Sequence, residues 1–122
     1  MDFNTQKPIF LQICDLISEK ILNHELVENT RIASVREMAS TMLVNPNTVQ
    51  RAYTELQTKG ILIQQRGIGY FVTKAAATIV LNIRKDEFMR IQLPEFLRQM
   101  QILGISWDEI QTIQSHLDQN KE

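Results

Sequence analysis

The sequence predicts a mainly α-helical fold with one small β-hairpin. Three segments before residue 60 repeat apolar residues at helical spacing. Two β-prone runs between residues 61 and 73 flank a glycine-containing turn, and helical spacing returns beyond Lys74. No apolar run approaches the roughly 18 residues of a membrane helix, and no signal peptide is expected at the N-terminus.

The first helix is expected over residues 9–23. Pro8 precedes it as a start signal. Isoleucines recur at every fourth position and define one apolar face: Ile9, Ile13, Ile17 and Ile21. Residues 24–31 are mostly polar and are expected to form a connector.

The second helix is expected to begin after Ser34, because Ser34 and Glu37 fit the S-x-x-E capping box. Arg36 then lies near the helix start and off its apolar face. That face is expected to contain Val35, Met38, Ala39, Met42 and Leu43.

The third helix is expected from Asn45 to about Lys59, with Gly60 as the C-terminal cap. Asn45 can cap the first turn, and Pro46 is suited to the first helical position. The spacing i, i+3, i+4, i+7 predicts a buried stripe of Val49, Ala52, Tyr53 and Leu56. The exposed early turns then contain Asn47, Thr48, Gln50 and Arg51, with no acid before Glu55.

A hairpin is expected over residues 61–73, with its turn at Arg66-Gly67-Ile68-Gly69. Glycine permits the positive φ of a tight turn and a close approach to another backbone. One helix, a helix-turn-helix pair and a hairpin, in this order, indicate a winged helix-turn-helix.

The segment from Lys74 is expected to be a helical tail. Residues 78–83 are rich in β-branched side chains, so helix and strand both remain open there. Beyond them Phe96, Met100 and Leu103 recur at helical spacing, Pro94 implies a kink or a new start, and Gly104 ends the helix. A second capping box, Ser106 to Glu109, opens a last short helix.

The charge distribution favours a nucleic-acid partner, although the net charge is −1. Residues 31–74 contain six basic and two acidic side chains, a local excess of four positive charges.

Enzymatic activity is not expected, because His24, His116 and the single Cys14 are scattered along the chain and form no catalytic pattern. Neither a cofactor nor a metal site is expected, and the lone thiol fits a cytoplasmic protein.

Side chains that donate and accept in pairs read base edges in the major groove. Arginine suits guanine, whereas asparagine and glutamine suit adenine. Asn47, Gln50 and Arg51 are of these types, and Thr48 can donate to phosphate. Arg66 in the turn could enter a minor groove, whose negative potential attracts arginine. A solvated polar surface is the alternative interpretation of the same residues.

The amino-acid sequences of several segments resemble the DNA-binding domain of the GntR family. The segments are PIFLQICDLISEKIL, RIASVREMA, VNPNTVQRAYTELQTKGIL and QRGIGYFV, and NPNTVQRAY with a short tail looks like the YtrA-like subfamily. The resemblance implies a winged helix over residues 1–73 and a helical dimerisation tail over 74–122. It implies a bacterial homodimeric regulator, most simply a repressor, on an inverted-repeat DNA operator. By position it assigns DNA contact to Arg36, Asn47, Thr48, Gln50, Arg51, Arg66 and Gly67.

The sequence departs from the family pattern at three places. Glu28-Asn29 stand where the family usually has Pro-Gly, and Ile32-Ala33-Ser34 where it has Leu-Pro-Ser. Ile68 stands between the turn glycines, where a basic residue is common, so we expect weaker non-specific DNA binding than in a relative with a basic tip.

Two points stay open at this stage. A winged helix used for protein–protein contact, without DNA binding, is the alternative function. It should not keep Arg36, Asn47, Gln50, Arg51 and Arg66 together. The tail is short for a separate effector domain, so whether a small-molecule effector binds, and where, is not evident from the sequence.

Overall fold

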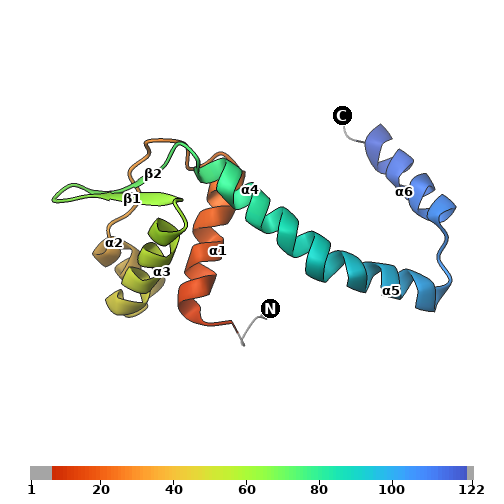
Figure 1. The fold of residues 1–122 in the computed structure, drawn as a ribbon, viewed down its shortest axis with the longest axis horizontal. Helices are drawn as coiled ribbons and strands as arrows, with labels where there is room; N and C mark the ends of the chain where they lie inside the picture. The colour runs from red at the N-terminus through yellow and green to blue at the C-terminus, as the bar shows by residue number, and fades with distance from the viewer. Residues whose placement is uncertain (1–6, 121–122) are drawn as a thin grey trace. The chain divides into compact units, whose positions relative to one another are not determined.

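The computed structural model describes residues 7–120, which form two compact units, one up to Ile83 and one from Arg84 on (Figure 1). The first unit contains α1 (Ile9–Leu22), α2 (Val35–Met42), α3 (Pro46–Thr58), β1 (Leu62–Gln65), β2 (Gly69–Val72) and the start of α4 (Ala76–Glu87). The second contains the end of α4, the π-helical turn η1 (Phe88–Gln92), α5 (Leu93–Leu103) and α6 (Trp107–Gln119). Within residues 7–120, none of the helices combines the length and apolar character needed to cross a bilayer.

The core of the first unit lies where α1, α3 and the hairpin meet. Of the predicted α1 face, Ile13, Ile17 and Ile21 are buried. Ile9, in the first turn, is 48% exposed, so the buried face begins one turn later than the spacing predicts. The buried residues of α3 are the predicted four: Val49, Ala52, Tyr53 and Leu56. Burying a large apolar side chain stabilises the fold by about 1.5–3 kcal/mol, so this stripe fixes which side of α3 faces outward.

Both predicted capping signals of the helix-turn-helix are present. The backbone N–H of Glu37 donates to Ser34 Oγ at 3.1 Å, and the backbone N–H of Ser34 donates to Glu37 Oε1 at 2.8 Å. Asn45 Oδ1 accepts from the backbone N–H of Asn47 at 2.7 Å, with Pro46 in the first turn of α3. The two helices therefore start where the sequence predicts.

The end of α2 differs from the prediction. Leu43 was expected on the apolar face, but it follows the last helical residue in the left-handed region, with φ 57° and ψ 47°, and is 90% exposed. The reversal of the backbone at Leu43 turns its side chain away from the core. Val44 instead packs against the core, and its N–H donates to the carbonyl of Ala39 at 3.0 Å.

The hairpin is antiparallel, with Leu62 opposite Val72 and Gln65 opposite Gly69. A segment ahead of α2 runs along the free edge of β2. The N–H of Asn29 donates to the carbonyl of Val72, and the N–H of Ile32 to that of Tyr70. Asn29 adopts φ 69°, a conformation asparagine tolerates, so it can serve where the family has glycine.

Residues 78–83, left open between helix and strand, are helical within α4. Ala76 and Val80 are buried in the core of the first unit, and Ile79 and Ile83 pack against that core. Burial on one helical face explains why β-branched residues adopt a helix here, since packing outweighs their modest propensity penalty. The first two turns of the predicted tail thus complete the core of the winged helix.

In the second unit Pro94 is accommodated by a π-helical turn. The N–H of Leu93 donates to the carbonyl of Phe88, five residues back, immediately before the proline. Proline lacks an N–H and its ring clashes with the carbonyl four residues earlier, and the wider turn relieves that clash. Gly104, at φ 67°, ends α5, and the second capping box, Ser106 with Glu109, opens α6; both features confirm the sequence prediction.

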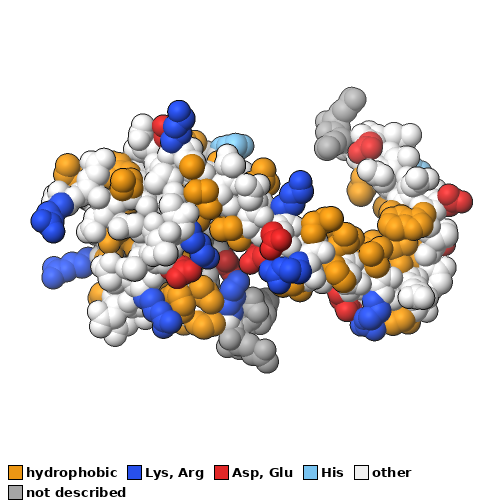
Figure 2. Space-filling model, viewed as in Figure 1, with side chains coloured by type: hydrophobic (Ala, Val, Ile, Leu, Met, Phe, Trp, Pro, Cys, Tyr) orange, Lys and Arg blue, Asp and Glu red, His pale blue; other side chains and the backbone are white. Residues whose placement is uncertain are grey.

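Among the described residues 84–120, only Met100 is buried. Large apolar side chains of this unit remain exposed: Phe88, Met89, Ile91, Phe96, Leu97, Ile102, Leu103, Trp107, Ile113 and Leu117. Figure 2 shows broad hydrophobic areas over the part of the chain formed by these helices. Exposed apolar surfaces of this extent are typical of sites that bind another protein, a membrane or a ligand.

Candidate nucleic-acid interface

The outward face of α3 presents most of the predicted contact residues. Asn47, Gln50 and Arg51 are exposed, and Thr48 is half-buried. The N-terminal turns of this helix carry no acidic side chain. Because the positive end of the helix dipole lies at the same turns, the helix start favours a negatively charged partner.

Gln50 connects α3 to the hairpin. Its Nε2 donates to the hydroxyl of Tyr70 on β2 at 3.0 Å and to Thr54 Oγ1 at 3.3 Å. The Tyr70 ring packs edge-to-face against Tyr53, with centroids 5.0 Å apart. Gln50, which the sequence predicted as a DNA-contact residue, is therefore oriented by a contact with β2 that the sequence did not indicate.

Tyr53 anchors this aromatic pair. It is fully buried, and its hydroxyl donates to the carbonyl of Ala33 at 2.7 Å, just ahead of α2. Burial raises the pKa of its hydroxyl well above the ordinary tyrosine range, so the group stays a donor at any physiological pH. The expectation that Tyr53 packs in the core rather than stacking on bases is consistent with this burial.

Arg51 lies against α1. Its guanidinium carbon sits 3.9 Å from the centroid of the Phe10 ring, within cation–π distance. The side chain is exposed, so its N–H donors remain accessible while the ring supports its flat face. The sequence did not indicate this contact, because Phe10 and Arg51 belong to different helices.

Arg36 is exposed in the first turn of α2. The neighbouring Glu37 is an acid with which an exposed arginine could pair. Glu37 instead accepts from the Ser34 backbone, and its pKa is lowered by hydrogen bonds from the backbone and side chain of Ser34 and, more weakly, by the charge of Arg31. The carboxylate is thus used in the cap.

The wing is the turn at residues 66–69. Gly67 has φ +77° and open space around it, so the turn geometry requires glycine and leaves the tip uncovered. Arg66 and Ile68 are both exposed there. Gly69, at φ +146°, lies so close to Arg31 that a Cβ would come within 2.7 Å of its Nε.

Arg31 also belongs to this region, although no sequence pattern predicted a role for it. Its Nε donates to the carbonyl of Ile68 at 3.0 Å and so holds the wing from the segment ahead of α2. The contact joins residues 37 positions apart, and no local pattern predicts such a pair. In the sequence, Arg31 was notable only as one of the six basic residues between positions 31 and 74.

The charges of this unit support an anionic partner. Figure 2 shows several Lys and Arg side chains on the face of the N-terminal unit in view.

No group of three or more metal-binding side chains occurs within residues 7–120. Cys14 is buried, its Sγ lies 3.5 Å from the carbonyl of Ala52, and burial raises its pKa to about 11, so its thiol is a poor nucleophile at neutral pH.

Comparison with known proteins agrees with this arrangement. Residues 10–72 match the family described as bacterial regulatory proteins, gntR family. The uncharacterized HTH-type transcriptional regulator YhcF of Bacillus subtilis (strain 168) is 40% identical, over 88% of this chain and 88% of its own length. The HTH-type transcriptional repressor YtrA of the same strain is 29% identical, over 90% of this chain and 84% of its own length.

The fold is also similar to a solved structure. A GntR-family protein from Bacteroides thetaiotaomicron superposes with a TM-score of 0.78 at 38% identity, covering 93% of this chain and 99% of the other. The family and these relatives are regulatory proteins rather than enzymes. The winged helix and the YtrA-like resemblance predicted from the sequence are confirmed. The chain is a DNA-binding transcriptional regulator, and it belongs to the GntR family of bacterial regulatory proteins.

Proposed function

We propose that this chain is a homodimeric repressor that binds an inverted-repeat operator in double-stranded DNA, in the bacterial cytoplasm. The observation that carries the proposal is the hydrogen bond from Gln50 to Tyr70. It joins the outward face of α3 to the hairpin, so that the helix and the wing can engage one duplex as a unit. A two-fold dimer reads two half-sites about one helical turn apart.

In this proposal α3 enters the major groove by its N-terminal turns. Asn47 and Arg51 contact base edges in pairs of hydrogen bonds, each good pair giving roughly 1–3 kcal/mol of discrimination. Gln50, whose Nε2 donates to Tyr70 and Thr54, offers its carbonyl oxygen to a base. Thr48 donates to a phosphate, and Arg36, at the start of α2, binds a phosphate on the flank. Apart from the half-buried Thr48, the side chains that make these contacts are exposed on α2 and α3.

The wing contributes a second contact. Arg66 lies in the minor groove, and Gly67 allows the backbone of the turn to approach the sugar-phosphate chain. Ile68 at the tip is apolar and exposed, so it adds no phosphate charge contact. We therefore expect this protein to bind DNA non-specifically more weakly than a relative with a basic wing tip. Its DNA affinity should also depend less steeply on salt concentration.

The tail forms the dimer in this proposal. The second unit leaves ten large apolar side chains exposed among its described residues, and a second copy of the chain covers them. Obligate homodimer surfaces are more apolar than ordinary surfaces, as this one is. The winged helix, whose core includes the start of α4, then reads DNA, and the second unit from Arg84 on pairs the subunits.

The test is a selection of bound sequences from random duplex DNA at about 0.1–0.2 M salt, where phosphate binding alone is weakened. The parent, Arg51→Ala and Phe10→Leu are compared. We expect an inverted repeat from the parent and the loss of one base preference per half-site from Arg51→Ala. Phe10→Leu removes the ring under Arg51 but keeps the guanidinium, so it should retain that preference.

Each other outcome has a definite meaning. No enrichment by the folded parent would contradict the proposal and favour a winged helix used for protein contact. Enrichment of a single half-site would retain DNA reading but contradict the dimer. Identical losses in Arg51→Ala and Phe10→Leu would show that Arg51 acts through its packing on α1 rather than on a base.

A further inference from the structure

A groove of about 300 Å³ lies in the first unit, between α1, α2 and the segment ahead of α2. Its lining is mainly apolar and includes Leu16 and Ile17 from α1 and Met38 and Met42 from α2. Small-molecule sites are concave, mostly apolar and range from about 300 to 1,000 Å³. The groove is therefore of a size that suits a small ligand.

The charged residues of the groove have one sign. Lys20 from α1 and Arg31 from the edge segment both line it, and both are exposed. None of the described residues that line it is acidic. Glu37 is near enough to Arg31 to interact with its charge, but its carboxylate accepts from the Ser34 backbone N–H. An apolar body with one anionic end complements this lining.

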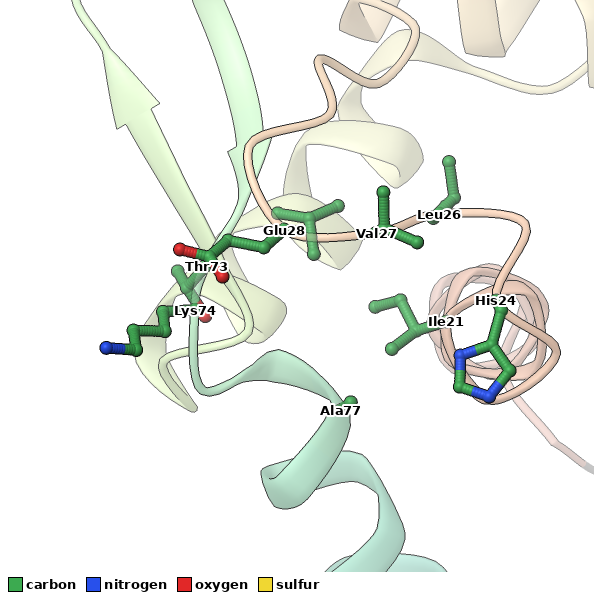
Figure 3. Close-up of a pocket in the computed structure, with 9 residues that line it drawn as sticks. Ile21, His24, Leu26, Val27, Glu28, Thr73, Lys74 and Ala77 are labelled. Atoms are coloured by element: carbon green, nitrogen blue, oxygen red, sulfur yellow. The ribbon is translucent and has the colours of Figure 1, made fainter.

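A second cavity in the same unit does not share this lining. It measures about 160 Å³ and lies between the end of α1, the connector that follows and the start of α4 (Figure 3). Its lining combines Glu28 with Lys74 and His24, so opposite charges face one space. It offers neither the size nor the single sign of charge found in the larger groove.

Arg31 can hold an anion and the wing at the same time. A guanidinium has five N–H donors, and the Nε donor is bonded to the carbonyl of Ile68. The terminal nitrogens remain able to bind a carboxylate in the bidentate manner typical of arginine. A ligand bound there would restrict the arginine that supports the wing.

We propose that the groove between α1 and α2 binds an amphipathic monoanion, such as a medium-chain carboxylate, with the chain against Leu16, Met38 and Met42 and the carboxylate on Arg31 and Lys20. The occupied groove stiffens the wing through Arg31. This places an effector site inside the winged helix itself, apart from both the DNA-reading face and the tail.

The test uses the full chain, labelled with ¹³C at the methionine methyl groups and with ¹⁵N at the backbone amides, and titrated with octanoate without DNA. Met38 and Met42 line the groove, whereas Met89 and Met100 belong to the second unit and act as internal controls. We expect saturable shifts of Met38 and Met42 with Met89 and Met100 unchanged. The backbone amide of Ile68 should move in parallel, because Arg31 links it to the groove.

Matched variants and a neutral ligand test the charge argument. Lys20→Gln and Arg31→Gln should each weaken octanoate binding about tenfold, the scale of one lost charge-assisted contact. Lys85→Gln, an exposed lysine of the second unit, should leave it unchanged. Octanol should bind more weakly than octanoate. Ala33→Leu, which fills the groove from an exposed position and keeps the charges, should abolish the Met38 and Met42 shifts.

Three results would overturn the proposal: no shift of Met38 and Met42, octanol binding as tightly as octanoate, or shifts confined to Met89 and Met100. Thermal unfolding of each variant checks that it is folded. If Arg31→Gln does not fold, Lys20→Gln, at a position outside the core, tests the charge argument alone. Because no DNA is present, failure of the operator selection and failure of this titration are separate results.

Discussion

The Nε2 of Gln50 on α3 donates a hydrogen bond to the hydroxyl of Tyr70 on β2, across a distance of 3.0 Å. Beneath it the Tyr70 ring rests edge-to-face on the buried Tyr53, whose own hydroxyl reaches the carbonyl of Ala33. A chain of two aromatic rings and two hydrogen bonds thus joins the wing, α3 and the segment before α2. The orientation of a candidate base-reading side chain is coupled in this way to the position of the wing.

Tyr70→Phe should uncouple them. It removes one hydroxyl and keeps the ring, so we expect a loss of about 0.5–1.5 kcal/mol in the free energy of unfolding. Gln50 would then keep only its longer hydrogen bond to Thr54, and the base preference that it supplies should relax. Urea denaturation measures the first effect, and selection of bound DNA measures the second.

Tyr53→Phe is the matched control for this prediction. It also removes one hydroxyl, leaving the carbonyl of Ala33 without that donor, so it should lower the stability by a similar amount. It does not touch Gln50 and should preserve the base preference. If both variants lost the same preference, the effect would come from the fold and not from the orientation of Gln50.

Leu43→Gly should stabilise the protein. The left-handed conformation at this residue costs a non-glycine side chain roughly 1 kcal/mol or more, and glycine adopts it without that cost. Since Leu43 is 90% exposed, its removal gives up almost no buried surface. Allowing for the greater freedom of glycine in the unfolded chain, we expect a net gain of about 0.5–1 kcal/mol, measured as a rise in the urea midpoint.

Leu43→Ala isolates the backbone contribution. Alanine keeps the Cβ that crowds the left-handed conformation, so this variant should show no comparable gain. A gain in Leu43→Ala as large as in Leu43→Gly would indicate that the exposed leucine, not its backbone, limits the stability.

Local signals in the sequence predicted most of the fold. The caps at Ser34, Asn45 and Ser106 act within three residues, and the stripes on α1 and α3 follow from helical geometry alone. Each of these features depends on neighbours in the chain, and each was found where the pattern indicated, except that Ile9 at the start of α1 is exposed.

The features that were missed depend on contacts between distant segments. Arg31 holds the carbonyl of Ile68, and Arg51 lies on Phe10, across separate elements. Leu43 was misassigned because helical periodicity was extended one residue past the actual end of α2, into a turn that no pattern marked. Propensity could not decide residues 78–83, because burial against the first unit determines their helix.

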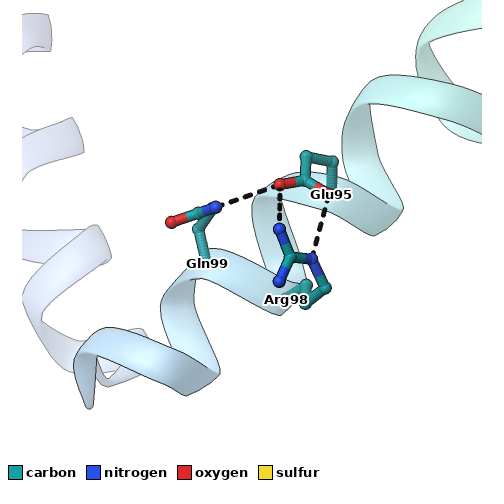
Figure 4. A network of polar contacts seen from close by, with 3 residues as sticks. All are labelled: Glu95, Arg98 and Gln99. Carbon is teal, nitrogen blue, oxygen red and sulfur yellow. Dashed lines mark hydrogen bonds and ion pairs between the residues drawn. The ribbon is translucent and has the colours of Figure 1, made fainter.

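Acid should weaken the second unit through Glu95. Arg98 donates to both of its carboxylate oxygens, at 3.0 and 2.7 Å, and Gln99 donates to one at 3.0 Å (Figure 4). These bonds, with the charge of Arg98, lower the pKa of Glu95 from 4.5 to about 2. A carboxyl whose folded pKa is depressed stabilises the fold above its unfolded pKa. That contribution should be fully present above about pH 4.5 and lost as the pH falls to about 2.

Glu95→Gln tests this window. The variant cannot titrate at this position, so the difference in melting temperature between parent and variant should be constant above pH 4.5 and shrink below it. Asp86→Asn, which removes another exposed carboxylate that pairs with an arginine, is the matched control. A difference between parent and Glu95→Gln that stays constant down to pH 2 would contradict the assignment.

Leu103→Asp should separate subunit pairing from DNA reading. Leu103 is 65% exposed at the end of α5, so a charge there should hardly change the stability of a single subunit. If the tail of a second subunit covers this surface, the same charge would be buried without an ion-pair partner, which is costly. We expect a monomer in sedimentation at micromolar concentration and operator affinity lowered at least tenfold, because each monomer binds one half-site. Gln101→Asp introduces the same charge at an exposed polar position nearby and should leave both properties unchanged. A monomeric Leu103→Asp that binds the operator as tightly as the parent would disprove the dimer model, since pairing would then contribute nothing to affinity.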